Sequence, residues 1–253
     1  MPTALITGAS SGLGAEFARQ LAARGADLVL VARDRQALAS SAARLRARYE
    51  VAVEVLVADL TSPRNLAAVE RRLASVERPV DLLVNNAGFG LPLAFERNDV
   101  DDEVDHLRLH VEAPMRLMHA ALGPMLARGH GRIVNVASIA AFIPRSTYGA
   151  VKGWLVSFSR WANVRYSPRG VNVTAVCPGF VHTNFHERLG LPPGQEGIAP
   201  VLWTDARTVV REALRAVARG RAVCVPSLRY KIIALVLRVL PASVTARLGA
   251  TGR

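Results

Sequence analysis

The side chains best suited to chemistry in this sequence are Tyr148 and Lys152. Of the 32 lysines and arginines only two are lysines, and one of them follows Tyr148 by four residues. Residues four apart share a helix face, and the compact ammonium of lysine is not interchangeable with the planar fork of arginine. A nearby cation lowers the pKa of a phenol from its usual value of about 10. The pair therefore predicts a tyrosine that acts as an acid or base, although a packed aromatic beside a solvated lysine would give the same short pattern.

A glycine-rich turn near the N-terminus has the composition of a phosphate-binding loop. The predicted strand Thr3–Thr7 leads into Gly8-Ala9-Ser10-Ser11-Gly12-Leu13-Gly14 and then into a helix. Glycines at such a turn let the backbone approach a pyrophosphate, and the helix start offers N–H groups and a positive dipole end. The spacing is Gly-x-x-x-Gly-x-Gly, unlike the common Gly-x-Gly-x-x-Gly. At the start of a strand–helix–strand unit it still predicts a dinucleotide site.

The end of the second predicted strand bears on the choice of dinucleotide. A carboxylate there would hold the 2′-hydroxyl of NAD, but the chain has Ala32 followed by Arg33. An arginine at this place accommodates the 2′-phosphate of NADP, so we predict NADP(H), with NAD(H) less favoured. Arg33 would also suit the start of a polar helix capped by Asp34, and the two roles are compatible.

Polar residues follow three further predicted strands. Asp59 is placed to accept a hydrogen bond from an adenine amino group, although a surface acid beside a helix would look the same. The Asn85-Asn86-Ala87-Gly88 segment suits a turn. Ser138 could hydrogen-bond a substrate carbonyl, although a serine at a strand end usually has no catalytic role.

The elements that position these residues alternate along the chain. Apolar or β-branched runs predict strands, and runs with helical spacing of apolar residues lie between them. This alternation predicts one α/β domain over residues 1–253, a Rossmann-type doubly wound parallel sheet of about seven strands with helices on both faces. The predicted strands are Thr3–Thr7, Asp27–Ala32, Val51–Val57, Val80–Val84, Arg132–Ala137, Val171–Cys177 and Ala222–Val225; the predicted helices are Leu13–Arg24, Arg35–Tyr49, Pro63–Val76, Val104–Ala127 and Thr147–Tyr166.

The amino-acid composition limits the cellular location and the binding partners that we expect for this protein. Two cysteines fit a reducing compartment, no signal-peptide pattern or long apolar run is present, and we expect a cytoplasmic protein. The net charge is +12, and residues 206–253 hold ten lysines or arginines and the single acid Glu212. No nucleic-acid-binding motif accompanies this charge, so we predict no nucleic-acid partner.

The basic tail, about residues 226–253, includes a largely apolar helical stretch at Leu228–Leu240 with Arg229, Lys231 and Arg238. This composition is consistent with peripheral contact with an anionic membrane surface. It is equally consistent with closure of a substrate pocket or with packing on another subunit. The three alternatives stay open from the sequence.

Taken in order, these motifs resemble those of the short-chain dehydrogenase/reductase family. The resemblance covers residues 1 to about 185 with specific motifs and extends loosely to about 225. The matching motifs are Thr7-Gly8-x-x-x-Gly12-x-Gly14, Asp59, Asn85-Asn86-Ala87-Gly88, Ser138, Tyr148-x-x-x-Lys152 and Pro178-Gly179-Phe180-Val181-x-Thr183. The resemblance implies a nicotinamide cofactor at the carboxyl ends of the strands and a homodimer or homotetramer.

The resemblance also implies a role for each matching residue. Tyr148 would be the general acid in carbonyl reduction, Lys152 would lower its pKa and bind the nicotinamide ribose, and Ser138 would orient the substrate oxygen. The cofactor supplies the hydride. The implied cofactor contacts are Gly8, Ser10, Ser11, Gly12, Leu13, Gly14, Arg33, Asp59, Leu60, Asn86, Ala87, Gly88, Tyr148, Lys152, Pro178, Gly179, Val181 and Thr183.

His110 departs from the family pattern. It lies twenty-two residues after Gly88, where the family usually has an asparagine that holds a water in a proton relay. Histidine can also donate and accept, and it titrates near neutral pH, so His110 is either a relay member or a packed helical residue. His182 and His186 are spaced like metal ligands, but they lack the glutamate of a zinc-protease motif, and we predict no metal.

The region of about residues 183–204 would set the substrate specificity. It is rich in apolar residues, namely Phe185, Leu189, Leu191, Ile198, Val201, Leu202 and Trp203. An apolar pocket predicts a hydrophobic ketone or alcohol, although the same residues could be ordinary core. The alternatives are a reductase of 3-oxoacyl thioesters, whose acidic carrier protein the basic tail would receive, and a sensor that binds NADP(H) without turnover.

Overall fold

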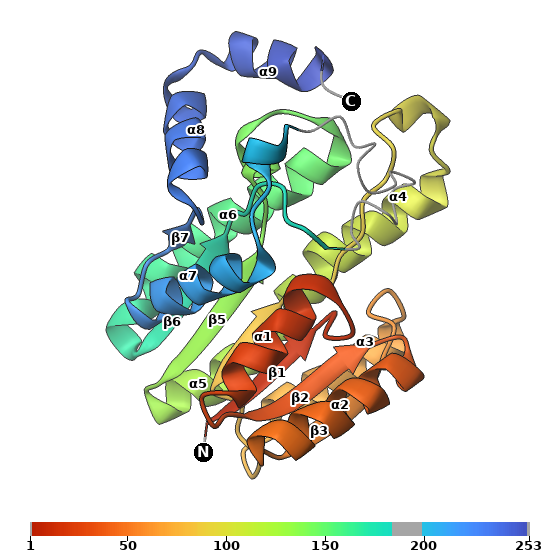
Figure 1. Cartoon of the computed structure of the whole chain (residues 1–253), viewed down its shortest axis with the longest axis vertical. Helices are drawn as coiled ribbons and strands as arrows, with labels where there is room; N and C mark the ends of the chain where they lie inside the picture. The colour runs from red at the N-terminus through yellow and green to blue at the C-terminus, as the bar shows by residue number, and fades with distance from the viewer. Residues whose placement is uncertain (1, 184–198, 252–253) are drawn as a thin grey trace.

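The computed structural model describes residues 2–183 and 199–251 and contains one parallel seven-stranded sheet (Figure 1). The strand order is β3-β2-β1-β4-β5-β6-β7, so the order reverses at β1 and leaves a switch point between β1 and β4. The strands are β1 Thr3–Thr7, β2 Asp27–Ala32, β3 Val53–Val57, β4 Leu82–Asn85, β5 Gly131–Val136, β6 Val171–Val176 and β7 Val223–Cys224. The predicted fold class is confirmed.

Helices cover both faces of this sheet (Figure 1). Phe17 of α1, Leu38 of α2 and Val210 of α7 belong to one buried cluster, whereas Leu66 of α3 and Leu117 of α5 belong to the other, with residues of α6. The helices are α1 Gly12–Ala22, α2 Arg35–Tyr49, α3 Pro63–Ala74, α4 Val100–Leu107, α5 Ala113–Arg128, α6 Ser146–Tyr166, α7 Ala206–Ala218, α8 Leu228–Val239 and α9 Ala242–Thr251. In the described part of the chain, no helix is long and apolar enough to cross a membrane.

The long helix predicted at Val104–Ala127 differs most from the structure. The helical segment begins four residues earlier, at Val100, because Asp99 accepts a hydrogen bond from the backbone N–H of Asp101 and caps α4. Acidic residues in the first turn complement the helix dipole, so the acidic run belongs inside the helix. A π-helical turn at Arg108–Glu112 then separates α4 from α5. Such turns are often found at functional sites.

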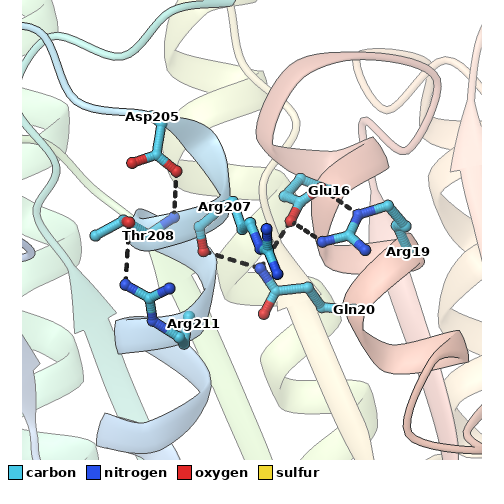
Figure 2. A network of polar contacts seen from close by, with 7 residues as sticks. All are labelled: Glu16, Arg19, Gln20, Asp205, Arg207, Thr208 and Arg211. Atoms are coloured by element: carbon cyan, nitrogen blue, oxygen red, sulfur yellow. Dashed lines mark hydrogen bonds and ion pairs between the residues drawn. The ribbon is translucent and has the colours of Figure 1, made fainter.

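Polar contacts tie the helix after the glycine turn to α7 (Figure 2). The Gln20 side chain of α1 donates to the carbonyl of Arg207 at 2.9 Å and to the Glu16 carboxylate at 2.7 Å. Asp205 caps α7 by accepting from the backbone N–H of Thr208. The Gln20–Arg207 contact joins two elements that are almost 200 residues apart in the chain and holds the C-terminal half of α1 against the start of α7.

A buried hydrogen-bond chain positions the strand and helix that carry the chemical residues. Asn135 on β5 accepts from the side chain of Asn85 on β4 and donates to Ser159 on α6, both at 2.9 Å. Ser159 in turn donates to the carbonyl of Leu155. Buried polar groups destabilise a protein when they are unpaired, so these hydrogen bonds specify how α6 packs against β5.

Replacing Asn135 with Leu should destabilise the protein. The change leaves the buried Asn85 side chain without its acceptor, so we expect the free energy of unfolding to fall by about 2–3 kcal/mol in urea titrations. Asn172→Leu on neighbouring β6 is the matched control, and it should cost less than about 0.5 kcal/mol. Equal effects of the two changes would contradict the role given to Asn135.

Candidate active site

The glycine turn between β1 and α1 packs directly against the end of β4. Gly8 and Gly12 both have positive φ, at 65° and 55°. A Cβ on Gly8 would lie 2.9 Å from both Ala87 Cα and Asn86 Nδ2, and a Cβ on Gly14 would collide with the Gly8 carbonyl. These glycines are therefore required by the fold of the turn itself.

Thr7 and Asn86 lock this turn to the Asn-Asn-Ala-Gly segment. Thr7 Oγ1 accepts from the backbone N–H groups of Asn86 at 2.9 Å and Ala87 at 3.0 Å. The Asn86 side chain donates back to the carbonyls of Thr7 and Gly8. The segment after β4 is extended and not the predicted turn, because the Asn86 amide bonds the carbonyls of the glycine loop and holds the backbone there.

The turn fits a dinucleotide phosphate. Helix α1 starts at Gly12, and the Ser11 side chain does not cap it. The positive end of the helix dipole therefore faces the glycine turn. Because Gly8, Gly12 and Gly14 have no side chains, a phosphate can approach the backbone there. Leu13 is partly buried against the core. Ser10 is partly exposed on the turn.

The other predicted cofactor residues lie at neighbouring strand ends. Arg33 is exposed after β2, and Asp34 caps α2 as predicted by accepting from the Ala37 N–H. Asp59 accepts from the backbone and side chain of Thr61, so it braces its own turn. The Leu60 side chain is buried in the core, which leaves only its backbone for contact with a cofactor.

Ser138 and Tyr148 meet beside the carboxyl end of β5. Ser138 follows β5, and its hydroxyl accepts from the Ala140 N–H at 3.1 Å. It also hydrogen-bonds the Tyr148 hydroxyl. Burial raises the pKa of Tyr148 to about 12, and the Ser138 hydrogen bond opposes this rise only partly. The expected lowering of the Tyr148 pKa is therefore not present in the protein alone.

Lys152 lies within reach of the tyrosine, as the helical spacing predicts. Its ammonium is 5.5 Å from the centre of the Tyr148 ring and donates to the carbonyl of Val136 at 2.9 Å. The side chain is almost fully buried, and burial lowers the pKa of Lys152 to about 7. Burial therefore disfavours the charged form of both groups: it lowers the pKa of the amine and raises that of the phenol.

His110 occupies the π-helical turn and anchors the loop after β4. Its Nε2 lies 2.8 Å from the Phe89 carbonyl and 3.2 Å from the Phe89 N–H. A Cβ on Gly88 would lie 2.5 Å from His110 Cε1, so the glycine makes room for the ring. Burial, and then Lys152, hold the pKa of His110 well below its usual range. It therefore does not titrate near neutral pH, contrary to the expectation from an unperturbed histidine.

His106 is a site residue that the sequence reasoning missed. It lies one helical turn before His110, with ring centres 4.4 Å apart, and 6.0 Å from the Tyr148 ring. It is fully buried, and neither ring nitrogen has a hydrogen-bond partner among the described residues. Burial and Lys152 lower its pKa to about 4. The four-residue spacing of the two histidines was the available signal.

The Pro178–Thr183 segment is held by a second missed residue, Tyr230 of α8. Its hydroxyl accepts from the Phe180 N–H at 3.0 Å and donates to the Leu202 carbonyl at 2.6 Å. Its ring lies so close to Gly179 that no Cβ would fit there. Helix α8 therefore shapes the loop that carries the predicted cofactor residues Pro178, Gly179, Val181 and Thr183.

The C-terminal end of the Pro178–Thr183 segment lies next to the glycine turn. The Thr183 side chain lies 3.4 Å from the position of a Cβ on Gly12, and Val181 forms an isolated bridge with Thr204. His182 stacks on Trp203 with ring centres 4.6 Å apart. The described residues contain no cluster of three metal-ligating side chains. His186 and the apolar residues Phe185, Leu189, Leu191 and Ile198 lie outside the described residues.

This is a dinucleotide-dependent protein of Rossmann type. Three features define it: the doubly wound sheet, the glycine turn at the switch point of the sheet, and the Ser–Tyr–Lys group. The model of the short chain dehydrogenase family matches residues 2–192. The chain belongs to this family, and it is an oxidoreductase of the kind that interconverts CH–OH and C=O groups.

Three proteins illustrate the similarity. A short-chain dehydrogenase from Sphingobium yanoikuyae, solved in complex with NADPH, is 36% identical, with a TM-score of 0.85 over 100% of this chain and 97% of that one. A bulky-bulky ketone specific alcohol dehydrogenase from Comamonas testosteroni is 33% identical, with a TM-score of 0.80 over 100% and 95%. Ketoacyl reductase HetN of Nostoc is 34% identical over 184 residues, which are 71% of this chain and 63% of that protein.

Replacing Lys152 with Met should stabilise the cofactor-free protein at pH 7. Burial lowers the folded-state pKa of Lys152 from 10.5 to about 7, so between pH 7 and 9 the unfolded chain binds more protons than the folded one. This contribution makes the wild type gain stability as pH rises. The variant should lack that gain, so its stability advantage over the wild type should be largest at pH 7 and should shrink by on the order of 2 kcal/mol between pH 7 and pH 8.5.

Urea unfolding at pH 7 and pH 8.5 measures the effect, with Lys231→Met as the control. The pH range of this comparison ends near pH 9. Burial raises the pKa values of Cys177 and Cys224, so above that pH the folded protein holds thiol protons that the unfolded chain has lost, and the folded protein loses stability. A Lys152→Met variant whose stability depends on pH as the wild type does would show that the buried amine is charged throughout.

Proposed function

We propose that this protein is an NADP(H)-dependent oxidoreductase that interconverts a ketone and a secondary alcohol on a hydrophobic small molecule. The observation that carries the proposal is the Ser138–Tyr148 hydrogen bond with the Lys152 amine 5.5 Å from the Tyr148 ring. A phenol held by a serine at the end of a central strand is a proton donor that a binding protein does not need. The cofactor would supply the hydride when bound.

The chain's own residues have separate tasks in this reaction. Tyr148 would hold the proton that passes to the substrate oxygen, and Ser138 would orient that oxygen through the hydroxyl that now contacts Tyr148. Lys152 would hold a proton next to the phenol and bind the ribose. His110 would act as a positioning residue, because its Nε2 hydrogen-bonds the Phe89 backbone and so fastens the loop that would lie against the cofactor.

The cofactor preference rests on β2 and on the neighbours. Arg33 is exposed beyond the strand end, and the chain has Ala32 where an acid would select NAD. The Sphingobium neighbour was solved with NADPH. The remaining cofactor contacts would be those of the glycine turn, Asp59 and Leu60, the Asn86–Gly88 segment and the Pro178–Thr183 segment.

The hydrophobic substrate is supported by the Comamonas neighbour and by the composition of residues 183–204. That neighbour is an alcohol dehydrogenase specific for bulky-bulky ketones. A 3-oxoacyl-thioester reductase is the second candidate, favoured by the likeness to the Nostoc ketoacyl reductase. A sensor without turnover is the third, and the complete Ser–Tyr–Lys group argues against it.

Several wider properties belong to the same proposal. We propose that residues 1–253 act as one cofactor-binding domain, with the substrate loop at about 183–204 and the tail at about 226–253. We further propose a cytoplasmic homodimer or homotetramer whose tail makes peripheral contact with membrane. The large exposed side chains Trp161 and Val164 on the outer face of α6 suit a subunit contact.

Replacing Tyr148 with Phe tests the proposed reaction. NADPH consumption against a panel of apolar ketones and 3-oxoacyl thioesters should fall by about a thousandfold or more, because the proton donor is lost while the ring remains. Binding of NADPH, followed by fluorescence, should change by less than about threefold. Tight NADPH binding without turnover in the wild type on every compound would favour the sensor.

Replacing Arg33 with Ala should weaken NADPH binding selectively. The loss of a charge-assisted contact to the 2′-phosphate should raise the Kd for NADPH about tenfold or more and leave that for NADH unchanged. Arg35→Ala, at the exposed first position of α2, is the matched control. Parallel weakening of NADPH and NADH by Arg33→Ala would place Arg33 outside the phosphate site.

A further inference from the structure

Helix α8 carries an apolar stripe that faces away from the protein. Leu228, Ile232, Leu235 and Val239 recur at helical spacing, and their side chains are between 57% and 74% exposed. Val236 extends the same stripe. Figure 1 shows α8 and α9 at the end of the molecule farthest from the N-terminus. A contiguous exposed apolar patch of this kind marks an interaction surface.

The opposite face of α8 is fixed to the protein. Tyr230, Ala234 and Leu237 are buried and also lie at helical spacing. Tyr230 binds the loop at Phe180 and Leu202, as described above. The helix therefore cannot turn its apolar stripe inward without breaking the loop that shapes the active site, and the stripe needs an external partner.

Cations line both edges of the stripe. On a helix with 3.6 residues per turn, Arg229 falls at one edge, and Lys231 and Arg238 fall at the other. All three are exposed, and α8 contains no acid. Each is held in place on the body: Arg229 bonds the Val201 carbonyl, Lys231 pairs with Glu212 at 3.1 Å, and Arg238 lies over the Phe142 ring.

We propose that α8 docks on an anionic lipid surface, with its stripe in the acyl–headgroup boundary and the guanidinium groups of Arg229 and Arg238 near the headgroups on its two sides. Apolar residues flanked by basic ones are the pattern of helices that lie in the membrane interface. A second copy of the chain is a poorer occupant. A two-fold contact through this stripe would bring identical basic edges together, and residues 206–253 offer a single acid, Glu212, which already pairs with Lys231.

Docking would place the membrane next to the active-site loop. Helix α8 touches both the Phe180 loop through Tyr230 and the segment Ile139–Phe142 after Ser138 through Arg238. An apolar substrate dissolved in the bilayer would then reach the site with little passage through water. The lipid contact itself does not rest on the proposed reaction, and vesicle binding is measured without substrate or turnover.

Vesicle co-sedimentation of the full chain tests the proposal. The wild type should bind vesicles of phosphatidylcholine with about one-third phosphatidylglycerol, and pure phosphatidylcholine should bind it at least about tenfold more weakly. Ile232→Glu with Leu235→Glu should reduce binding to the anionic vesicles about tenfold or more. The matched control is Val76→Glu with Val100→Glu, which makes the same charge change at exposed valines elsewhere and should bind at least about five times more strongly than the stripe variant.

A second measurement does not depend on how the charged variant folds. Cys177 and Cys224 are buried, so Leu235→Cys can carry an environment-sensitive fluorophore selectively. Its emission should shift to shorter wavelength with anionic vesicles, and that of a labelled Val76→Cys should not.

Three outcomes would overturn the proposal: no binding of the wild type, equal binding of the stripe variant and its control, or no emission shift at position 235. Light scattering that showed a smaller assembly for the stripe variant, with no vesicle binding by the wild type, would assign the stripe to a second copy.

Discussion

The burial of Lys152 is the constraint on which the rest of this site depends. An amine that is almost enclosed, with the Val136 carbonyl as its hydrogen-bond acceptor, loses much of its affinity for a proton. The same enclosure raises the pKa of Tyr148 and keeps His106 and His110 neutral. The protein alone therefore holds its proton donor in the protonated form.

The fold makes this enclosure possible by bringing distant segments to one edge of the sheet. Ser138 follows β5, and Tyr148 and Lys152 come from α6. His106 comes from α4, and His110 comes from the π-helical turn between α4 and α5. The Asn135 hydrogen bonds set α6 against β5, and Tyr230 sets the Pro178–Thr183 segment from the far end of the chain. The buried face of α8 thus belongs to the architecture of the site, which leaves its outer stripe for another partner.

Much of this arrangement was predictable because it is encoded locally. Glycines at a strand end, a Tyr and a Lys one helical turn apart, and valine-rich runs between helical ones predict a parallel sheet with its chemistry at the carboxyl ends of the strands. His106 and Tyr230 were not predictable, because their roles arise from contacts with segments far away in the chain. The direction of the Tyr148 pKa was missed for a related reason: spacing shows that a lysine is near, but burial decides whether that lysine is charged.

The most direct test is an NMR titration of the lysine side chains in the cofactor-free protein. The chain contains only Lys152 and Lys231, so ¹³C-labelled lysine gives two side-chain signals, and the one retained in Lys231→Arg belongs to Lys152. We predict that this signal titrates with a pKa of about 7. A titration midpoint above about 10, the value of an ordinary exposed lysine, would show that the amine keeps its charge in the interior and would contradict the account of the site given above.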